Sequence, residues 1–551
     1  MSPRRRISAA APLLAAVLAA TGLLTAACGR SLGAGASSQQ VSPTKGLVTT
    51  TPAGTTPVAS VTWAVYRPVN SLDPIFAFDY PENTAISLMC ESLLHQAPDG
   101  SIQPGLATVV TPSPTTMVFT LRPGVKFWDG NPVTPADVVY SLDRQMEPSY
   151  GGFYGGVFSR VKSIAATGAD QVTITLNQPD YWLEGELSSI PGVIIQKSYA
   201  VKEGTNYGTP AGGIMCTGPY EFKSWTAGAG VTAVANPHYW NPAVKPLVRQ
   251  IIIKGVSSAA SFTSGMLTGA IQGSYYSGLS NLSEFEHSST VRVYQGPGEE
   301  TDALVVSATT GPLASVKVRQ ALSLALDRQA IISQVYDGAA VMPRWLANPG
   351  TFGYGQSVFT KAYDSSPVLT QNLAQARKLV REAGVTGQTI TIGTSSEIAS
   401  IAAETGAYQQ AAEAIGLKVV LKSVSAADYI NFFTSAQARA GIDGFITVNY
   451  GDYADPAALL ATFALPGGDQ NYDNFSNPQM TALLNQAEGT ANPDARAALV
   501  AKAEELATKL LPWIPDVQPT SVLFLSKGLT GAVASFSYMF APWADNLGGT
   551  R

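Results

Sequence analysis

Residues 121–141 read LRPGVKFWDGNPVTPADVVYS, and this stretch decides the fold. Thr134 stands immediately before Pro135, and Asp137 follows three residues after Thr134. A hydroxyl and a carboxylate at that spacing can accept hydrogen bonds from the free N–H groups of a first helical turn, and proline is favoured at the first helical position. The stretch therefore predicts a capped helix over residues 134–146, preceded by a strand over residues 117–121.

Hydrophobic periodicity on either side of this stretch predicts a mixed α/β chain. Alternating apolar and polar residues, rich in Val, Thr and aromatic side chains, predict strands at residues 60–67, 117–121, 171–176, 220–225, 231–235 and 250–254. Helical periodicity with a starting cap predicts helices at residues 134–146, 315–336, 372–383, 398–415, 477–487 and 492–510. Strands dominate the first half, and strands alternate with helices in the second, which predicts two lobes of mixed α/β character.

The composition excludes several classes of protein. The 551-residue chain is 45% hydrophobic and 13% charged, so it can bury a large core and is not disordered as a whole. Its 39 acidic residues outnumber 34 basic ones, and no long basic run follows the N-terminus, which argues against nucleic-acid binding. After residue 27 no apolar run reaches the ~18 residues of a membrane-spanning helix, so the chain is not expected to form a channel.

The N-terminus has the pattern of an export signal. Three arginines at residues 4–6 precede an uncharged stretch over residues 7–27, which ends in small residues directly before Cys28. This order favours a cleavable signal peptide at residues 1–27, and an uncleaved anchor helix is the alternative. The small residues before Cys28 resemble a lipobox, so we expect lipidation of Cys28 and anchoring to the outer face of the cytoplasmic membrane. Residues 28–57, almost free of charge and aromatic side chains, are expected to form a flexible tether.

Motifs for catalysis or metal binding are missing from the sequence. The histidines, His95, His238 and His287, are widely separated, and no His-Glu-x-x-His or paired Cys-x-x-Cys motif occurs. The chain also has no Gly-x-Ser-x-Gly elbow and no phosphate-binding Gly-x-x-x-x-Gly-Lys loop. We therefore expect a protein that is not an enzyme, without a metal or cofactor, and a hydrolase is the weakest alternative.

Several segments, in order along the chain, resemble one family, the family 5 extracellular solute-binding proteins of ABC importers. Residues 121–141 are close to that family's signature of a strand, tight turns and a capped helix. Further matching segments are residues 70–74, 217–222, 236–240, 318–328, 376–384, 415–417, 452–456 and 477–478. The resemblance extends over residues 58–528. Members of the family are best known for binding oligopeptides, dipeptides and nickel.

The resemblance implies an α/β fold with two lobes that close around a ligand, of the periplasmic-binding-protein type (type II, similar to cluster C). The first lobe is expected at residues 58–296 and 516–551, with an extra subdomain inserted at about residues 81–199, and the second lobe at residues 297–515. Such a protein is expected to be a monomer that delivers a peptide to a membrane permease driven by an ATPase. The same scaffold with another solute (chelated nickel, an amphiphile or a sugar), or acting as a sensor lipoprotein, is the alternative.

The resemblance also implies a ligand site near the loop at residues 451–456. By register, Asp452 pairs with the α-ammonium of a peptide, and the alternative for Asp452 is a carboxylate that caps its own loop. Asp455 before Pro456 is expected to form a turn or begin a helix. Residues 393–396 lack the arginine with which dipeptide binders hold the peptide carboxylate, which favours a longer peptide or an uncharged amphiphile. The other candidate site residues are Asn449, Tyr450, Ser395, Ser396 and Thr217.

Two further sets of residues have open interpretations. Cys90 and Cys216 form either a disulfide, which an exported location permits, or two buried free thiols. A set of aromatic residues either lines the ligand cleft or belongs to the core: Tyr66, Phe76, Tyr80, Tyr275, Tyr276 and Tyr450.

Overall fold

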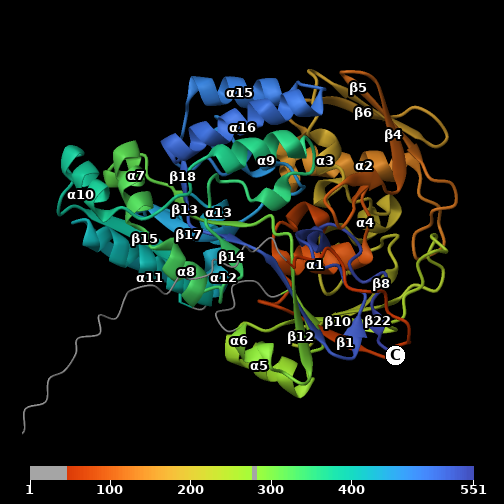
Figure 1. Cartoon of the computed structure of the whole chain (residues 1–551). Helices are drawn as coiled ribbons and strands as arrows, with labels where there is room; N and C mark the ends of the chain where they lie inside the picture. Colours follow the sequence, from red (N-terminus) through yellow and green to blue (C-terminus); the bar gives the residue numbers. More distant parts are fainter. Residues whose placement is uncertain (1–45, 276–281, 397) are drawn as a thin grey trace, which may run out of the picture. The chain divides into compact units, whose positions relative to one another are not determined.

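The computed structural model describes residues 46–275, 282–396 and 398–551 (Figure 1). The predicted signal peptide, Cys28 and Tyr276 lie outside these described residues. Within them the chain forms three main sheets, two of which are mixed parallel and antiparallel, together with the helices that cover them.

The first lobe is built on a seven-stranded sheet with strand order β12-β20-β11-β1-β10-β9-β8. Its strands are β1 (Val61–Val65), β8 (Tyr220–Thr226), β9 (Gly230–Ala235), β10 (Gln250–Gly255), β11 (Gly273–Ser274), β12 (Val291–Gly296) and β20 (Ser521–Ser526). The central strand β1 is parallel to β10 and β11, whereas β20 is antiparallel to both of its neighbours. The sheet thus combines strands from residues 61–296 with one strand, β20, from near the C-terminal end of the chain.

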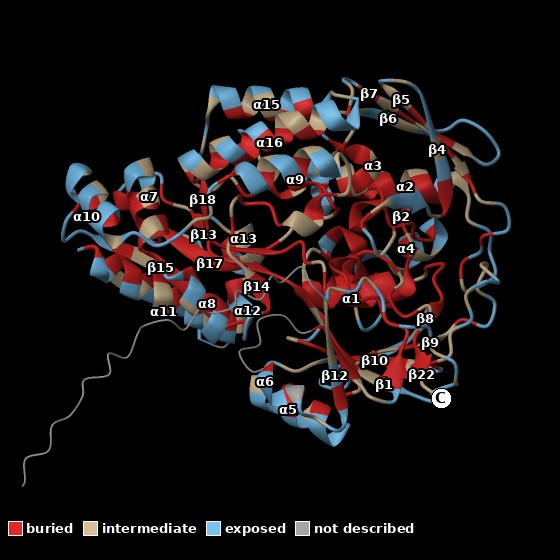
Figure 2. Cartoon of the chain, in the orientation of Figure 1, coloured by how far each residue is buried: buried red, intermediate tan, exposed pale blue. Residues whose placement is uncertain are grey.

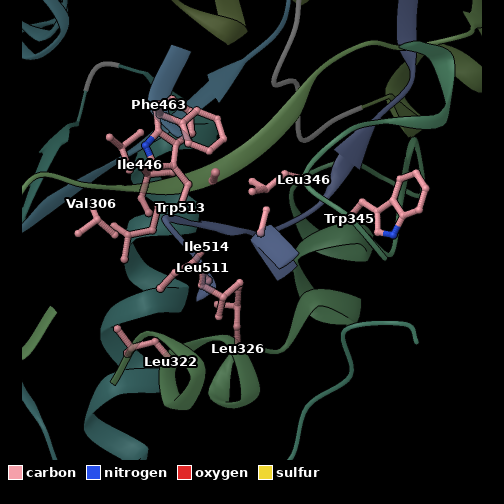
Figure 3. Packing of buried hydrophobic residues seen from close by; sticks show 14 of the residues in the cluster. Val306, Leu322, Leu326, Trp345, Leu346, Ile446, Phe463, Leu511, Trp513 and Ile514 are labelled. Carbon is pink, nitrogen blue, oxygen red and sulfur yellow. The ribbon is translucent and has the colours of Figure 1, made fainter. Parts of the chain in front are cut away.

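The second lobe is built on a five-stranded sheet with strand order β16-β15-β17-β13-β18. Its strands are β13 (Thr301–Val306), β15 (Thr389–Ser395), β16 (Lys418–Val424), β17 (Gly444–Asn449) and β18 (Trp513–Pro515). The ring of Trp513 stacks on that of Phe463 at 4.2 Å, beside Ile446 (Figure 3). Three helices, α9 (Gln356–Ser365), α15 (Pro478–Glu488) and α16 (Pro493–Leu510), pack together in this half (Figure 1).

A third, four-stranded sheet contains the stretch at residues 121–141. Its strand order is β4-β5-β7-β6, with β4 (Ala107–Ser113), β5 (Thr116–Leu121), β6 (Val161–Ala166) and β7 (Gln171–Leu176). Helix α2 (Pro135–Met146) follows, and Thr134 and Asp137 form the reciprocal capping box. The side chains of Val138 and Leu142 pack with this sheet in a separate hydrophobic core. The predicted strand and capped helix are therefore confirmed.

The chain passes twice between the two large sheets, from β12 to β13 and from β18 to β20. These crossings support the proposed boundaries of the lobes, which remain a prediction. Helix α1 (Tyr80–Met89) packs in the core of the seven-stranded sheet, and its ten residues are all buried (Figure 2). A helix buried on every side has no amphipathic period, which is why the periodicity did not predict α1.

The predicted helix at residues 315–336 is wrong as one element. The structure has two helices there, α7 (Val316–Ala325) and α8 (Arg328–Gln334). The carboxylate of Asp327 accepts a hydrogen bond from the N–H of Ala330 and so begins a new helix. The guanidinium of Arg328 is buried and donates to the carbonyl oxygens of Ser323 and Pro515. The helix is interrupted between α7 and α8, where the cap by Asp327 and the hydrogen bonds of Arg328 replace the backbone hydrogen bonds of a continuous helix.

The other predicted helices agree with the structure to within two residues at each end, with α10 (Leu373–Glu382) and α11 (Ala399–Ala414) completing the set. The remaining helices are α3 (Leu183–Glu186), α4 (Lys197–Glu203), α5 (Ala259–Thr268), α6 (Ser283–Glu286), α12 (Ala426–Tyr429), α13 (Asn431–Thr434) and α14 (Pro456–Ala464). The short strands are β2 (Leu94–Gln96), β3 (Ile102–Pro104), β14 (Ala340–Val341), β19 (Gln518–Pro519), β21 (Leu529–Thr530) and β22 (Gly548–Gly549).

The predicted tether at residues 28–57 is too long. Residues 46–57 lie against the C-terminal segment, where Thr50 forms a β-bridge with Val533 and Thr56 with Gly549. The buried hydroxyl of Thr51 accepts hydrogen bonds from two backbone N–H groups of that segment. A sequence of small polar residues is ordered here because distant backbone groups supply its hydrogen bonds.

Cys90 ends helix α1 and is joined to Cys216 by a disulfide. The bond connects α1 to the segment that leads into β8. Among the described residues, the helices are all too short or too polar to cross a membrane.

Candidate functional site

A cavity of about 320 Å³ lies between the lobes and is lined by residues from three parts of the chain. From the first lobe these include Tyr66, Phe78, Asp79, Tyr80, Ser257, Ser258 and Ala259. The inserted part contributes Phe153, Tyr154, Val157 and Glu186. From the second lobe they include Ser396, Tyr429, Phe433, Asn449, Tyr450, Asp452, Asp469 and Gln470. A ligand in this cavity would contact both lobes, as ligand-driven closure requires.

Side chains of the two lobes contact each other directly. The hydroxyl of Tyr80 donates to Glu300 at 2.5 Å, and that of Tyr450 donates to the carbonyl oxygen of Phe78 at 3.1 Å. Arg160 of the inserted part forms an ion pair with Glu488 at the end of α15, at 2.5 Å. The two lobes are therefore in direct contact in this structure.

Asp452 lies in the loop between β17 and α14, and contacts on both sides fix this loop. The side chain of Gln96 donates to the backbone carbonyl of Asp452 at 2.8 Å. Asp455 begins α14 by accepting a hydrogen bond from the N–H of Ala457 at 2.8 Å, as predicted for this residue. Asp455 thus caps the helix, which leaves the side chain of Asp452 to line the cavity.

Burial raises the pKa of Asp452 to about 7, and a hydrogen bond with Tyr154 opposes this rise. The cavity lining holds three other acidic residues, Asp79, Glu186 and Asp469, and burial also raises the pKa of Asp469. No Lys, Arg or His occurs among the described residues that line the cavity. Because a buried carboxylate is stabilised by a nearby cation, the lining favours a positively charged ligand group.

The remaining predicted site residues are divided between the cavity and other places. The amide of Asn449 donates to Gln470 at 2.7 Å within the lining, and Ser396 also lines the cavity. Ser395 is buried in β15 and is not part of the lining. Thr217 was predicted for the site, but its hydroxyl donates to Glu91 at 2.7 Å, away from the cavity.

Glu91 explains the position of Thr217. It also accepts hydrogen bonds from Tyr239 and Trp240 and lines a second, separate cavity of about 210 Å³. Thr217 therefore donates to a carboxylate of the first lobe and does not line the cavity between the lobes.

Three of the predicted aromatic residues, Tyr66, Tyr80 and Tyr450, line the cavity. Phe76 is 43% exposed, and Tyr275 stacks on Tyr538 at 3.6 Å in the core. Other aromatic lining residues were not predicted: Phe78, Phe153, Tyr154, Tyr429 and Phe433. They come from loops and short elements, where periodicity gives no signal for them.

Among residues 46–275, 282–396 and 398–551, no group of three His, Cys, Asp or Glu side chains is arranged to hold a metal ion. The disulfide occupies both described cysteines. The described lining of the cavity offers carboxylates, hydroxyls, amides and aromatic rings to a ligand.

Comparison with known proteins gives one consistent family. The sequence model of one protein family, described as bacterial extracellular solute-binding proteins, family 5 Middle, matches residues 101–471 of this chain. Heme-binding protein A of Haemophilus influenzae is 27% identical over 472 residues, which cover 79% of this chain and 83% of that protein. The periplasmic murein peptide-binding protein MppA of Escherichia coli is 26% identical, covering 84% of this chain and 88% of MppA.

A solved structure shares the fold. The periplasmic binding protein DppA from Helicobacter pylori, in complex with the peptide STSA, superposes with a TM-score of 0.79 at 21% identity. The match covers 90% of this chain and 99% of that chain. The two-lobed architecture is therefore common to both proteins.

Proposed function

The chain belongs to the bacterial extracellular solute-binding proteins of family 5, and from this premise we propose that it is the peptide-binding lipoprotein of an ABC importer. It captures a peptide between its two lobes and delivers it to a membrane permease coupled to an ATPase. It works as a monomer and has no catalytic activity. Lipidated Cys28 anchors it to the outer face of the cytoplasmic membrane.

The observation that carries this proposal is the half-buried carboxylate of Asp452 in a cavity between the lobes without a basic side chain in its described lining. The α-ammonium of a peptide supplies the cation that Asp452 lacks. An ion pair in such a cavity is screened less by water and salt than one on the surface. Asn449 and Tyr450 flank this contact, and Ser396 lies in the same lining.

The relatives support a peptide as the ligand. MppA is named for binding murein peptide, and the DppA structure contains a peptide. Heme-binding protein A is named for a different solute, so heme is the control ligand to test beside peptides.

The experiment measures the thermal shift of the purified protein with pools of peptides and with heme. A ligand at 100 times its Kd stabilises the folded state by about 2.7 kcal/mol, which gives a clear rise in Tm. We expect peptides to produce this rise and Asp452→Asn to remove most of it. Asp364→Asn is the matched control, because Asp364 is exposed on α9 and outside the cavity.

The peptide proposal fails if heme stabilises the protein and no peptide does. Unchanged peptide stabilisation in Asp452→Asn would instead remove Asp452 from the site and leave peptide binding in place.

A further inference from the structure

Glu186 is an acidic side chain in the cavity wall that the α-ammonium contact leaves unused. It belongs to α3 of the inserted part, whereas Asp452 belongs to the second lobe. Its Oε2 atom is buried and accepts no hydrogen bond from any residue that the structure describes. Buried carboxylate oxygens are normally hydrogen-bonded, so this atom calls for a donor from a ligand.

Close backbone packing brings Glu186 and Asp452 into one region of the cavity. Gly185 lies against the ring of Tyr453 so closely that a Cβ atom on Gly185 would meet a ring carbon at 2.2 Å. Glu186 and Asp452 are the chain neighbours of these two contacting residues. Burial, and after it the charge of Asp452, raises the pKa of Glu186 well above its usual range. The two carboxyl groups therefore repel each other when both are ionised.

The charges around the cavity are not balanced by the protein. Asp79 forms an ion pair with Arg67, which lies behind the lining and also pairs with Glu82. Glu186, Asp452 and Asp469 form no ion pair with any residue in the described part of the chain. A zwitterionic ligand would bring one cation to three acids and would add a carboxylate without a basic partner. A ligand with two cationic groups matches the lining better.

We propose that Glu186 and Asp452 together select peptides with an N-terminal lysine or arginine, which carry two cationic groups close to each other. Asp452 binds the α-ammonium, and Glu186 binds the side-chain cation. This inference rests on the proposed function, because it assumes that a peptide occupies the cavity. Charge-assisted hydrogen bonds to two carboxylates give both affinity and selectivity, since a neutral side chain leaves Glu186 without a donor.

The test compares two tripeptide amides by isothermal titration calorimetry, Lys-Ala-Ala amide and norleucine-Ala-Ala amide. Norleucine keeps a linear alkyl chain and lacks the charge, and the amide removes the peptide carboxylate from both probes. We expect the protein to bind the lysine peptide at least about tenfold more tightly. Glu186→Gln should reduce this preference to within about twofold, because glutamine has the same shape without the charge.

Two variants make the result specific. Glu184→Gln changes the same residue type on the same helix but outside the cavity lining, and it should keep the full preference. Glu186→Asp keeps the negative charge and should retain part of the preference. Thermal melting of each variant establishes that it is folded before its affinities are compared.

Selection of basic peptides and peptide binding itself are distinguished by different outcomes. Equal affinity of the unmodified protein for the lysine and norleucine peptides would overturn the selection of basic peptides and leave peptide binding standing. A lysine preference that survives in Glu186→Gln would remove Glu186 from that selection. Failure of all peptides, charged or neutral, to bind would overturn the proposed function itself.

Discussion

Tyr154 of the inserted part and Asp452 of the second lobe both line the cavity and interact with each other. Burial is the larger influence on Asp452 and raises its pKa to about 7, while the hydrogen bond with Tyr154 lowers it. An ammonium group binds the ionised carboxylate far better than the neutral acid. We therefore expect the affinity for a peptide ammonium to rise as the pH increases through about 7.

Tyr154→Phe tests how far the hydroxyl of Tyr154 lowers the pKa of Asp452. The substitution removes the hydrogen bond that favours ionised Asp452, so the pKa of Asp452 rises further and the gain in affinity moves to higher pH. Peptide affinity should fall more at pH 6 than at pH 7.5, where the peptide α-ammonium, with a pKa of about 7.7–8.0, is still mostly protonated; calorimetry at both values measures this. The single hydroxyl proton of Tyr154 is shared with the carbonyl oxygen of Ala77, 2.9 Å away, so melting is measured alongside. An equal loss at both pH values would contradict the role of Tyr154.

Asp452 and Glu186 differ in how far the sequence could predict them. Asp452 lies in a short motif, residues 452–456, that resembles a family segment and could be placed by register. Glu186 lies in a helix of four residues without a motif, and its position follows only from the packing of Gly185 on Tyr453. Contacts between residues so distant along the chain are a tertiary property that local patterns do not carry.

At the scale of elements, α3 and the loop before α14 are in contact where Gly185 packs against the ring of Tyr453. An alanine at position 185 would place its Cβ 2.2 Å from a ring carbon of Tyr453, so α3 and the loop before α14 would have to move apart. Gly185→Ala should lower the free energy of unfolding by roughly 1–3 kcal/mol, the usual range for overpacking, and should weaken peptide binding. Urea denaturation and calorimetry measure the two effects.

Gly406→Ala is the matched control for this substitution. Gly406 lies within α11, and a Cβ there would have nothing within 4 Å. Alanine should stabilise that helix by roughly 0.5–1 kcal/mol, because glycine loses more backbone freedom on folding. Similar effects from the two substitutions would show that Gly185 has no special contact.

Helices α1 and α2 show why some elements could be predicted and others could not. Helix α2 has a capping box, an N-terminal proline and one buried face, and these features are readable in the sequence. Helix α1 also has proline near its start, but its ten residues are all buried, which removes the periodic signal. Tertiary burial, rather than local propensity, determines α1.

At the scale of the whole molecule, many acidic residues are buried. Burial raises the pKa of Glu300 and Glu504 to about 8, and those of Asp302 and Asp516 to about 7. In the unfolded chain these groups titrate near pH 4, so the folded state holds more protons between about pH 4 and 8. The stabilisation that protonation provides is therefore lost as the pH rises through this range.

The free energy of unfolding should be higher at pH 5.5 than at pH 8.5, by about 2 kcal/mol or more, when measured by urea denaturation. Glu504→Gln removes one of these titrating groups and should reduce the difference by about 1 kcal/mol. Greater stability at pH 8.5 would mean that these carboxyl groups are ionised in the folded protein.

The central claim is that the α-ammonium of a peptide binds Asp452 between the closed lobes. Calorimetry with a tripeptide and its N-acetylated form tests it most directly, because the two ligands differ only at that group. We predict that acetylation weakens binding at least about tenfold, and that Asp452→Asn removes the difference by weakening binding of the free peptide. Equal affinity of the unmodified protein for the free and acetylated peptides would contradict the claim.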